Sequence, residues 1–256
     1  MFLCIDIGNT NIVIGCFNDV NEKVCDFRLS TKRNATIDEL AMTFVELLRF
    51  NGVSEKDIEG AIISSVVPEL ESNLKEVFKK YFNLEPIFVG PGIKSGINIK
   101  LDNAKQLGAD LLVGAVGATE KYKEPVLIID IGTAMTITFV NDKKEFIGGA
   151  IMPGVRTAFS NLIDKAAKLE EVSFEDSTNP IGHNTKDCIQ SGMIFGWSSM
   201  IDGMIDKYQK ELGDFKVVLT GGEARYLVKH LEHKVIYDDN LLLDGLKTLY
   251  LKNNRK

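Results

Sequence analysis

The same order of apolar and polar residues occurs twice in the chain, about half a chain length apart. In the first copy, apolar residues 2–5 lead into Asp6-Ile7-Gly8-Asn9-Thr10, and a second apolar run follows. In the second copy, apolar residues 126–129 lead into Asp130-Ile131-Gly132-Thr133, again followed by a β-rich run. Each copy is typical of a buried strand, a short polar turn and a returning strand. An internal repeat of this kind predicts two halves with the same architecture.

Helices and strands are expected to alternate after each copy of this pattern. In the first half, we expect strands over residues 24–30, 61–63 and 86–89 and helices over residues 37–50, 70–81 and 106–121. In the second half, we expect strands over residues 145–151, 216–219 and 235–236 and helices over residues 154–169, 185–212, 223–231 and 240–251. Thr36 is the expected N-cap of the helix over residues 37–50.

This order of elements predicts an α/β protein with two lobes, each built on a mixed sheet. We place the boundary between residues 1–115 and 116–256, with the helix over residues 106–121 bridging the lobes. No low-complexity linker separates them. We therefore expect an extensive interface with a cleft.

Composition narrows the class of protein without naming a function. The 256 residues are 45% hydrophobic and 26% charged, which fits a globular protein with room for two small cores. A net charge of −6 argues against binding to nucleic-acid backbone. No run of 18 apolar residues occurs, so we expect no membrane span. Composition therefore argues against nucleic acid and membrane as partners.

The cysteines and the N-terminal segment favour a cytoplasmic protein. Cys4, Cys16, Cys25 and Cys188 form no C-x-x-C pair, so we expect buried, reduced thiols. Asp6 interrupts the N-terminal apolar run too early for a secretory leader.

The two Asp-x-Gly turns have the chemistry of a phosphate site. Gly8 and Gly132 lack a Cβ that would keep a phosphate oxygen away from the backbone. Backbone, amide and hydroxyl donors in a turn form an anion-binding concavity. A carboxylate repels phosphate unless a cation such as Mg²⁺ bridges the two. One such turn is also ordinary hairpin chemistry, but two in equivalent positions favour a shared role.

Three further segments carry glycines near helix starts. Thr220-Gly221-Gly222-Glu223 follows a predicted strand, and a glycine-rich run over residues 148–154 precedes a predicted helix. Gly108-Ala109-Asp110 lies near the start of the bridging helix, where an acidic residue is also favoured by the helix dipole. Each segment fits either close approach of a ligand to the backbone or simple helix capping.

Taken together and in this order, seven segments resemble type III pantothenate kinases. The family belongs to the superfamily of acetate and sugar kinases, heat-shock ATPases and actin, whose lobes are duplicated ribonuclease-H-like folds. The resemblance runs from residue 1 to about residue 250. The segments are Asp6-Ile7-Gly8-Asn9-Thr10-Asn11, Ser64-Ser65-Val66-Val67-Pro68, Gly108-Ala109-Asp110, Asp130-Ile131-Gly132-Thr133-Ala134, residues 148–154, Ile181-Gly182-His183-Asn184-Thr185 and Thr220-Gly221-Gly222.

The resemblance implies ATP-dependent phosphorylation of pantothenate to 4′-phosphopantothenate, the first step of coenzyme A biosynthesis, by a homodimer. Asp110 would be the general base, Asp6 would lie near Mg²⁺, and Asp130 would bind a monovalent cation, K⁺ or NH₄⁺. The implied ATP-binding residues are Asp6, Ile7, Gly8, Asn9, Thr10, Asn11, Ile12, Val13 and Thr133. The implied acceptor-binding residues are Leu101, Gly108, Ala109, Asp110, Leu111 and Thr185, with Thr185 acting across the dimer interface.

Two departures from the family pattern concern the acceptor. Members usually read Gly-Ala-Asp-Arg where this chain has Leu111, and that Arg is expected to pair with the pantothenate carboxylate. Many members carry Tyr-x-Asn-Pro where this chain reads Leu101-Asp102-Asn103-Ala104. Losing a charge-assisted pair costs about 1.5–3 kcal/mol, or roughly 10–150-fold in binding. The candidates to replace the missing charge are Lys94, Lys100 and Lys105.

Two alternative functions follow from these departures. A diverged paralogue would phosphorylate another small alcohol, since Leu101 and Leu111 both make the acceptor pocket more apolar. A non-catalytic nucleotide-binding regulator would need no acceptor, but retention of Asp6, Asp110 and Asp130 argues against it.

Overall fold

A computed structural model of the chain describes residues 1–123, 125–166, 169, 172–173 and 179–254. The chain forms two compact units. Unit 1 comprises Met1–Ile97, Asp102–Glu120 and Leu241–Lys256, and unit 2 comprises Asn98–Leu101 and Lys121–Asn240. This division differs from the expected boundary at residue 115, because the C-terminal helix returns to pack on the N-terminal sheet.

Among the described residues of unit 1, five strands form a mixed sheet in the order β3-β2-β1-β4-β5. β1 pairs antiparallel with β2 and parallel with β4, as expected for a strand, a turn and a returning strand. β2 pairs antiparallel with β3, and β4 pairs parallel with β5. The strands are β1 (Phe2–Ile7), β2 (Asn11–Phe17), β3 (Lys23–Ser30), β4 (Gly60–Ser65) and β5 (Ile87–Phe88).

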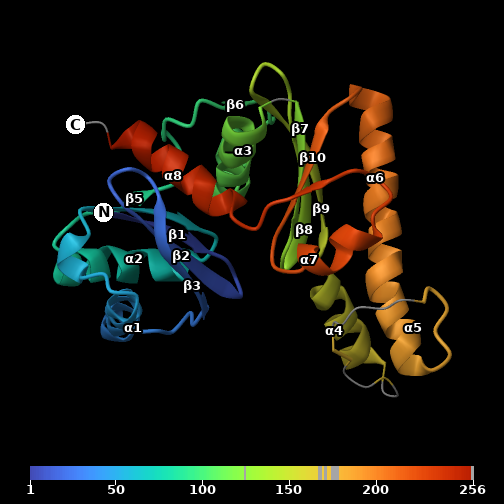
Figure 1. The fold of residues 1–256 in the computed structure, drawn as a ribbon, viewed down its shortest axis with the longest axis horizontal. Helices are drawn as coiled ribbons and strands as arrows, with labels where there is room; N and C mark the ends of the chain where they lie inside the picture. The colour runs from blue at the N-terminus through green and yellow to red at the C-terminus, as the bar shows by residue number, and fades with distance from the viewer. Residues whose placement is uncertain (124, 167–168, 170–171, 174–178, 255–256) are drawn as a thin grey trace. The chain divides into compact units, whose positions relative to one another are not determined.

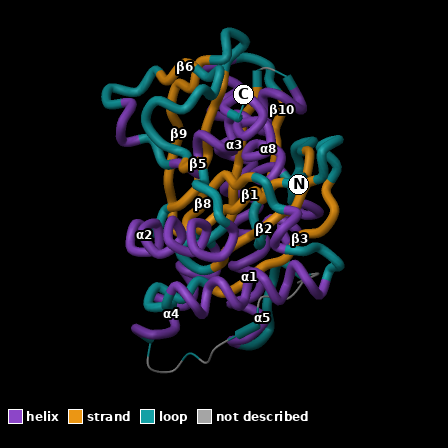
Figure 2. The backbone as a smooth tube through the Cα atoms, turned by 90° about the vertical axis from the view of Figure 1, so that its left-hand side faces the viewer, coloured by secondary structure: helices purple, strands orange, loops and turns teal. Residues whose placement is uncertain are grey.

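Side chains alternate across β1 and divide the packing of unit 1 into two layers. Leu3, Ile5 and Ile7 face a core completed by α1 (Ile37–Phe50) and α2 (Pro68–Val77). Phe2 and Cys4 face the opposite core, completed by α3 (Ala109–Tyr122) and α8 (Leu241–Asn253). Figures 1 and 2 show these two helix pairs on opposite faces of the sheet.

Close contacts fix α3 and α8 on this sheet. The ring of Tyr250 stacks on Phe2 with 4.2 Å between centroids, over a surface where Gly60 leaves room for its hydroxyl. A Cβ on Gly245 would collide with the carbonyl of Val113, so the two helix backbones touch where they cross. Glycine permits this approach because it has no side chain.

Local sequence explains where several helices of unit 1 begin. The hydroxyl of Thr36 accepts from the backbone N–H of Glu39, whose carboxylate accepts from the N–H of Thr36, and this capping box confirms the predicted start of α1. α2 begins with Pro68 and continues as a π-helical turn over Phe78–Phe82. Short 3₁₀ turns lie at Glu55–Asp57 and Ala104–Gln106.

Unit 2 repeats the sheet of unit 1. Among its described residues, six strands run in the order β11-β10-β7-β8-β9-β6, with the β7, β8 and β9 pairs antiparallel and the remaining pairs parallel. The predicted internal repeat is therefore confirmed, and β6 is an addition at the edge. The strands are β6 (Asn98–Ile99), β7 (Val126–Ile131), β8 (Ala134–Val140), β9 (Glu145–Pro153), β10 (Lys216–Thr220) and β11 (Ile236–Tyr237).

The helices of unit 2 contribute to one apolar core with Leu127, Ile129 and Ile131 of β7. They are α4 (Val155–Lys165), α5 (Thr185–Ser191), α6 (Trp197–Leu212) and α7 (Ala224–Leu227), with a π-helical turn at Gly192–Gly196 and a 3₁₀ turn at Val228–His230. The expected helix over residues 154–169 ends at Lys165; residues 167–168 of that prediction lie outside the described residues.

Within the described ranges, no helix combines the length and the apolar character needed to cross a membrane. The four cysteines are free; Cys4 and Cys16 are buried as expected, whereas Cys188 on α5 is exposed.

Candidate functional site

The first Asp-x-Gly turn connects β1 to β2 at the surface of unit 1. Asp6 lies in register between Val13 of β2 and Ser64 of β4. The N–H of Gly8 donates to the carbonyl of Asn11 at 2.9 Å and closes the turn. The predicted phosphate-binding residues Asn9 and Thr10 at its tip are exposed, so a ligand can reach them.

The end of β3 holds this turn from outside. The Thr31 hydroxyl donates to the carbonyl of Gly8 at 2.7 Å, and its N–H donates to the carbonyl of Thr10 at 2.9 Å. Two residues later, Arg33 Nη2 donates to Asn9 Oδ1 at 2.7 Å. Arg33 could not be predicted from the sequence, because no local pattern links it to Asn9, 24 residues away.

The second Asp-x-Gly turn has the same construction in unit 2. Asp130 lies in register between Thr136 of β8 and Thr220 of β10, as Asp6 does between its neighbours. The N–H of Gly132 donates to the carbonyl of Ala134 at 3.0 Å. The N–H of Gly154, which follows β9, donates to the carbonyl of Thr133 at 2.9 Å, matching the bond from Thr31 to Thr10. The two turns are thus structural equivalents.

The Gly-Gly turn after β10 packs directly against Asp130. Gly221 has a φ of +96°, and a Cβ there would meet the Asp130 carboxylate and the backbone of Ile131. Glu223 donates its N–H to the carbonyl of Ile131 at 3.2 Å and pairs with Arg156 Nε at 3.3 Å. Burial raises the pKa of the Glu223 carboxyl, and the N–H and charge of Arg156 oppose that shift. The ion pair between Arg156 and Glu223 was also not predicted from the sequence.

Asp110 lies in the first turn of α3, which begins at Ala109, three residues later than the sequence predicts. Burial raises the pKa of this carboxyl, while the N–H of Leu111, which donates to Asp110 Oδ1 at 2.8 Å, lowers it. A carboxylate with a raised pKa is a stronger base. Gly108 has little room for a side chain, since its Cβ would lie 2.5 Å from Asp110 Oδ1.

Strand alternation brings Asp6 and Asp110 to the same side of the sheet of unit 1. Cys4 faces the core completed by α3 and α8, so Asp6, two residues further along β1, points to that side. Ser64 does the same on β4, two residues after Ile62. α3, which carries Asp110, covers this side.

The other expected acceptor residues belong to different elements. Leu101 follows β6, and its side chain lies against Gly148 of β9. Thr185 is the exposed first residue of α5, after the N-cap Asn184. Lys100 pairs with Glu145 at 3.2 Å and is therefore committed to an ion pair within unit 2.

The described residues contain no group of three or more His, Cys, Asp or Glu side chains arranged to hold a metal ion. Asp6 and Asp130 each offer one carboxylate at a turn. Mg²⁺ commonly binds through one or two carboxylates, substrate phosphates and water, so a single Asp6 carboxylate fits that ion.

Comparison with solved structures defines the class of protein. The fold matches the activator of 2-hydroxyisocaproyl-CoA dehydratase from Clostridium difficile (TM-score 0.58, 13% identity, 99% of this chain and 94% of that one). It also matches a polyphosphate/ATP-glucomannokinase from Arthrobacter (TM-score 0.50, 12% identity, 98% of both chains). The chain therefore has the duplicated α/β fold of sugar kinases and actin-like ATPases, as predicted.

Sequence comparison identifies the family within that class. The family model for type III pantothenate kinases matches residues 2–207. The type III pantothenate kinase of Halalkalibacterium halodurans is 41% identical over 254 residues, which cover 99% of this chain and 100% of that protein. The corresponding protein of an Exiguobacterium species is 39% identical over 255 residues, covering 100% of both. The chain belongs to the type III pantothenate kinase family.

Proposed function

We propose that this protein catalyses the ATP-dependent phosphorylation of pantothenate to 4′-phosphopantothenate, the first step of coenzyme A biosynthesis. Similarity to type III pantothenate kinases over essentially the whole length of both chains carries the proposal. The equivalent Asp-x-Gly turns of the two units support it. Binding of a nucleoside triphosphate needs backbone N–H groups close to the phosphates and a cation that bridges the phosphates to a carboxylate.

In this proposal, the Asp6 turn binds the ATP phosphates through residues 6–13, and Thr133 is a further ATP contact. Asp6 holds Mg²⁺, which neutralises charge on the phosphates when it is bound. Asp130 binds a monovalent cation, K⁺ or NH₄⁺. The exposed tip of the Asp6 turn and the packing of Gly221 on Asp130 fit these roles.

Asp110 takes the proton from the hydroxyl group of the acceptor. The hydroxyl oxygen forms a bond to the γ-phosphorus, the bond from that phosphorus to the β,γ-bridging oxygen breaks, and ADP leaves. Burial that raises the Asp110 pKa supports this role, because a stronger base accepts the proton more readily. The position of Asp110 on the same side of the sheet as Asp6 also supports it.

The oligomer and the location of the enzyme form part of the proposal. The protein acts as a cytoplasmic homodimer, in which Thr185 reaches the acceptor across the subunit interface. Its exposed position at the start of α5 leaves the side chain available for that contact.

A second function is favoured by one observation at the acceptor site. Leu111 and Leu101 stand where the family pattern places a charged and an aromatic residue, and Lys100 is already paired with Glu145. A small alcohol without a carboxylate would suit these residues better than pantothenate does.

A coupled assay of ADP release tests both functions. Purified protein is supplied with Mg²⁺-ATP and either pantothenate or pantothenol, its analogue without the carboxylate, in K⁺, NH₄⁺ or Na⁺ buffers. Turnover of pantothenate that needs K⁺ or NH₄⁺, with phosphopantothenate identified by mass spectrometry, is the expected result. Turnover of pantothenol alone would support the second function, and no turnover of either would reject both.

A further inference from the structure

Arg33 stands beside the candidate phosphate turn without a role in the reaction described above. Its Nη2 donates to Asn9 Oδ1 at 2.7 Å, and its Nη1 lies 3.5 Å from Glu69 Oε1. The side chains of Arg33 and Glu69 are 56% and 57% exposed, so water weakens their attraction. The bond to Asn9 is therefore the better defined of the two contacts.

This contact determines which end of the Asn9 amide faces a ligand. An amide group has an oxygen that repels phosphate and an NH₂ group that donates to it. Arg33 occupies the oxygen, and no described residue accepts a hydrogen bond from Nδ2 of Asn9. The NH₂ group is thus left to face an anion at the tip of the turn.

The equivalent arginine of unit 2 has a more buried acidic partner than Arg33 has. Arg33 lies two residues after Thr31, whose N–H donates to the carbonyl of Thr10 in the Asp6 turn. Arg156 likewise lies two residues after Gly154, whose N–H donates to the carbonyl of Thr133 in the Asp130 turn. The two arginines therefore occupy equivalent positions. Arg156 pairs with Glu223, whose side chain is only 12% exposed. Among the described residues, the acidic partner of Arg33 is the exposed Glu69, and the Arg33 guanidinium also donates to Asn9 of the turn.

We propose that Arg33 is a positioning residue for the nucleotide phosphates, which orients the Asn9 amide and adds positive charge beside the Asp6 turn. Guanidinium groups suit this task because they are always charged and present several donors in a fixed plane. The inference rests on the proposed function, since it assumes that the Asp6 turn binds a nucleotide.

The test compares the affinity for nucleotide in four variants with that of the unmodified protein. Calorimetry measures binding of Mg²⁺-AMP-PNP, a non-hydrolysable ATP analogue, and the coupled assay measures KM for ATP and for pantothenate. Arg33→Ala is expected to weaken AMP-PNP binding and raise KM for ATP by about tenfold, the effect of one charge-assisted contact. KM for pantothenate and the melting temperature are expected to stay unchanged.

The remaining variants separate positioning from charge and from structural effects. Arg33→Lys keeps the positive charge but lacks the planar set of guanidinium donors, so its affinity for AMP-PNP should fall by about threefold. Asn9→Ala should weaken binding, and the double variant Arg33→Ala/Asn9→Ala should bind no more weakly than Arg33→Ala, because the two residues act together. The matched control is Arg49→Ala, which removes an exposed arginine paired with Glu55 at the end of α1 and should leave AMP-PNP binding unchanged.

Three results would overturn the inference. They are unchanged AMP-PNP binding in Arg33→Ala, additive losses in the double variant, and an equal rise of both KM values together with a lower melting temperature. Protein that binds AMP-PNP but phosphorylates no acceptor would reject the proposed function while the Arg33 comparison still stands. Protein that binds no nucleotide at all would reject both.

Discussion

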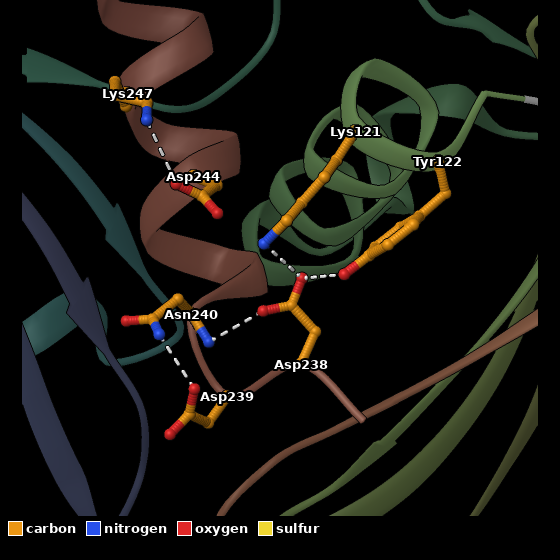
Figure 3. A network of polar contacts seen from close by, with 7 residues as sticks. All are labelled: Lys121, Tyr122, Asp238, Asp239, Asn240, Asp244 and Lys247. Atoms are coloured by element: carbon orange, nitrogen blue, oxygen red, sulfur yellow. Dashed lines mark hydrogen bonds and ion pairs between the residues drawn. The ribbon is translucent and has the colours of Figure 1, made fainter. Parts of the chain in front are cut away.

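Asp238 joins the two ends of the main segment of unit 2, and its removal is expected to destabilise the protein. This segment begins at Lys121 and Tyr122 and ends at Asn240, two residues after Asp238. The Asp238 carboxylate accepts from Lys121 Nζ at 2.9 Å, from the Tyr122 hydroxyl at 2.6 Å and from the N–H of Asn240 at 3.1 Å (Figure 3).

The expected magnitude follows from the burial of each partner. The side chain of Asp238 is 5% exposed, whereas that of Lys121 is 42% exposed and can return to water. Hydrogen bonds to a charged group contribute about 1.5–3 kcal/mol each, and the exposed lysine contributes less. Asp238→Asn removes the charge and turns an NH₂ group toward these donors, so we expect a loss of about 2–4 kcal/mol. For a chain of this size that loss lowers the melting temperature by about 4–16 °C.

Thermal and urea denaturation followed by circular dichroism measure this loss. The matched control is Asp239→Asn, since Asp239 is the exposed neighbour and, within the part of the chain that the structure describes, accepts only from the side chain of Asn240 at 2.8 Å. The melting temperature of the Asp239→Asn variant should change by no more than about 2 °C. Equal melting temperatures for Asp238→Asn and the control would refute the reasoning.

The same network predicts how stability depends on pH. Burial and the Asp238 carboxylate raise the pKa of Tyr122 to about 12. Because the folded pKa exceeds the unfolded value of about 10, this stabilisation is complete below pH 10 and is lost as pH rises toward 12. Tyr122→Phe should remove that alkaline loss. Burial would raise the pKa of Asp238, but hydrogen bonds from Tyr122 and Lys121 outweigh it and lower the pKa, so its contribution is lost in acid.

Three further substitutions test other parts of the structure. Asp110→Asn should lower kcat by about 10²–10⁴-fold at an unchanged melting temperature, and near-normal turnover would exclude Asp110 as the base. Gly245→Ala should cost about 1–3 kcal/mol in urea denaturation, because its Cβ collides with the Val113 carbonyl; normal stability would contradict that close crossing. Ser64→Ala should keep or raise the melting temperature, since the buried Ser64 hydroxyl has no hydrogen-bond partner among the described residues, whereas Ser65→Ala should lower it by losing the bond from the Val67 N–H. A large loss in Ser64→Ala would show that its hydroxyl is bonded.

The elements that follow from local sequence could be predicted closely. α1 spans the predicted residues 37–50 because the Thr36 and Glu39 capping box fixes its start and the apolar spacing fixes its face. The two Asp-x-Gly turns could be found because an apolar strand, a polar turn and a returning strand are encoded within about fifteen residues. The strands of both repeats form as expected.

Elements that depend on tertiary contacts could not be predicted. The expected helix over residues 185–212 is interrupted by a π-helical turn at Gly192–Gly196, and apolar spacing alone does not reveal such a turn. The bridging helix starts only at Ala109, because Asn103 caps a separate 3₁₀ turn. α8 joins unit 1 through Tyr250 and Gly245, which touch residues more than a hundred positions away.

The candidate site divides in the same way. Asp6, Asp110 and Asp130 could be predicted as candidate residues because each lies within a local motif, and their roles stay predictions. Their supporting partners Arg33 and Glu223 were not assigned a role, since each acts on a turn that belongs to another part of the sequence.

The two ligand contacts that we propose, a triphosphate at one turn and a small ion at the other, would use equivalent frameworks with different turns. In both units an aspartate is flanked in register by a hydroxyl-bearing residue, Ser64 in unit 1 and Thr220 in unit 2. The turn after Asp6 is longer, closing from Gly8 to Asn11, and its tip is exposed, which suits a bulky triphosphate. The turn after Asp130 closes over a shorter span, and Gly221 packs against Asp130 itself, which suits the small ion that we propose beside this carboxylate. In this proposal the strands supply the positions of the aspartates, and the length of each turn and the packing around its aspartate select the ligand.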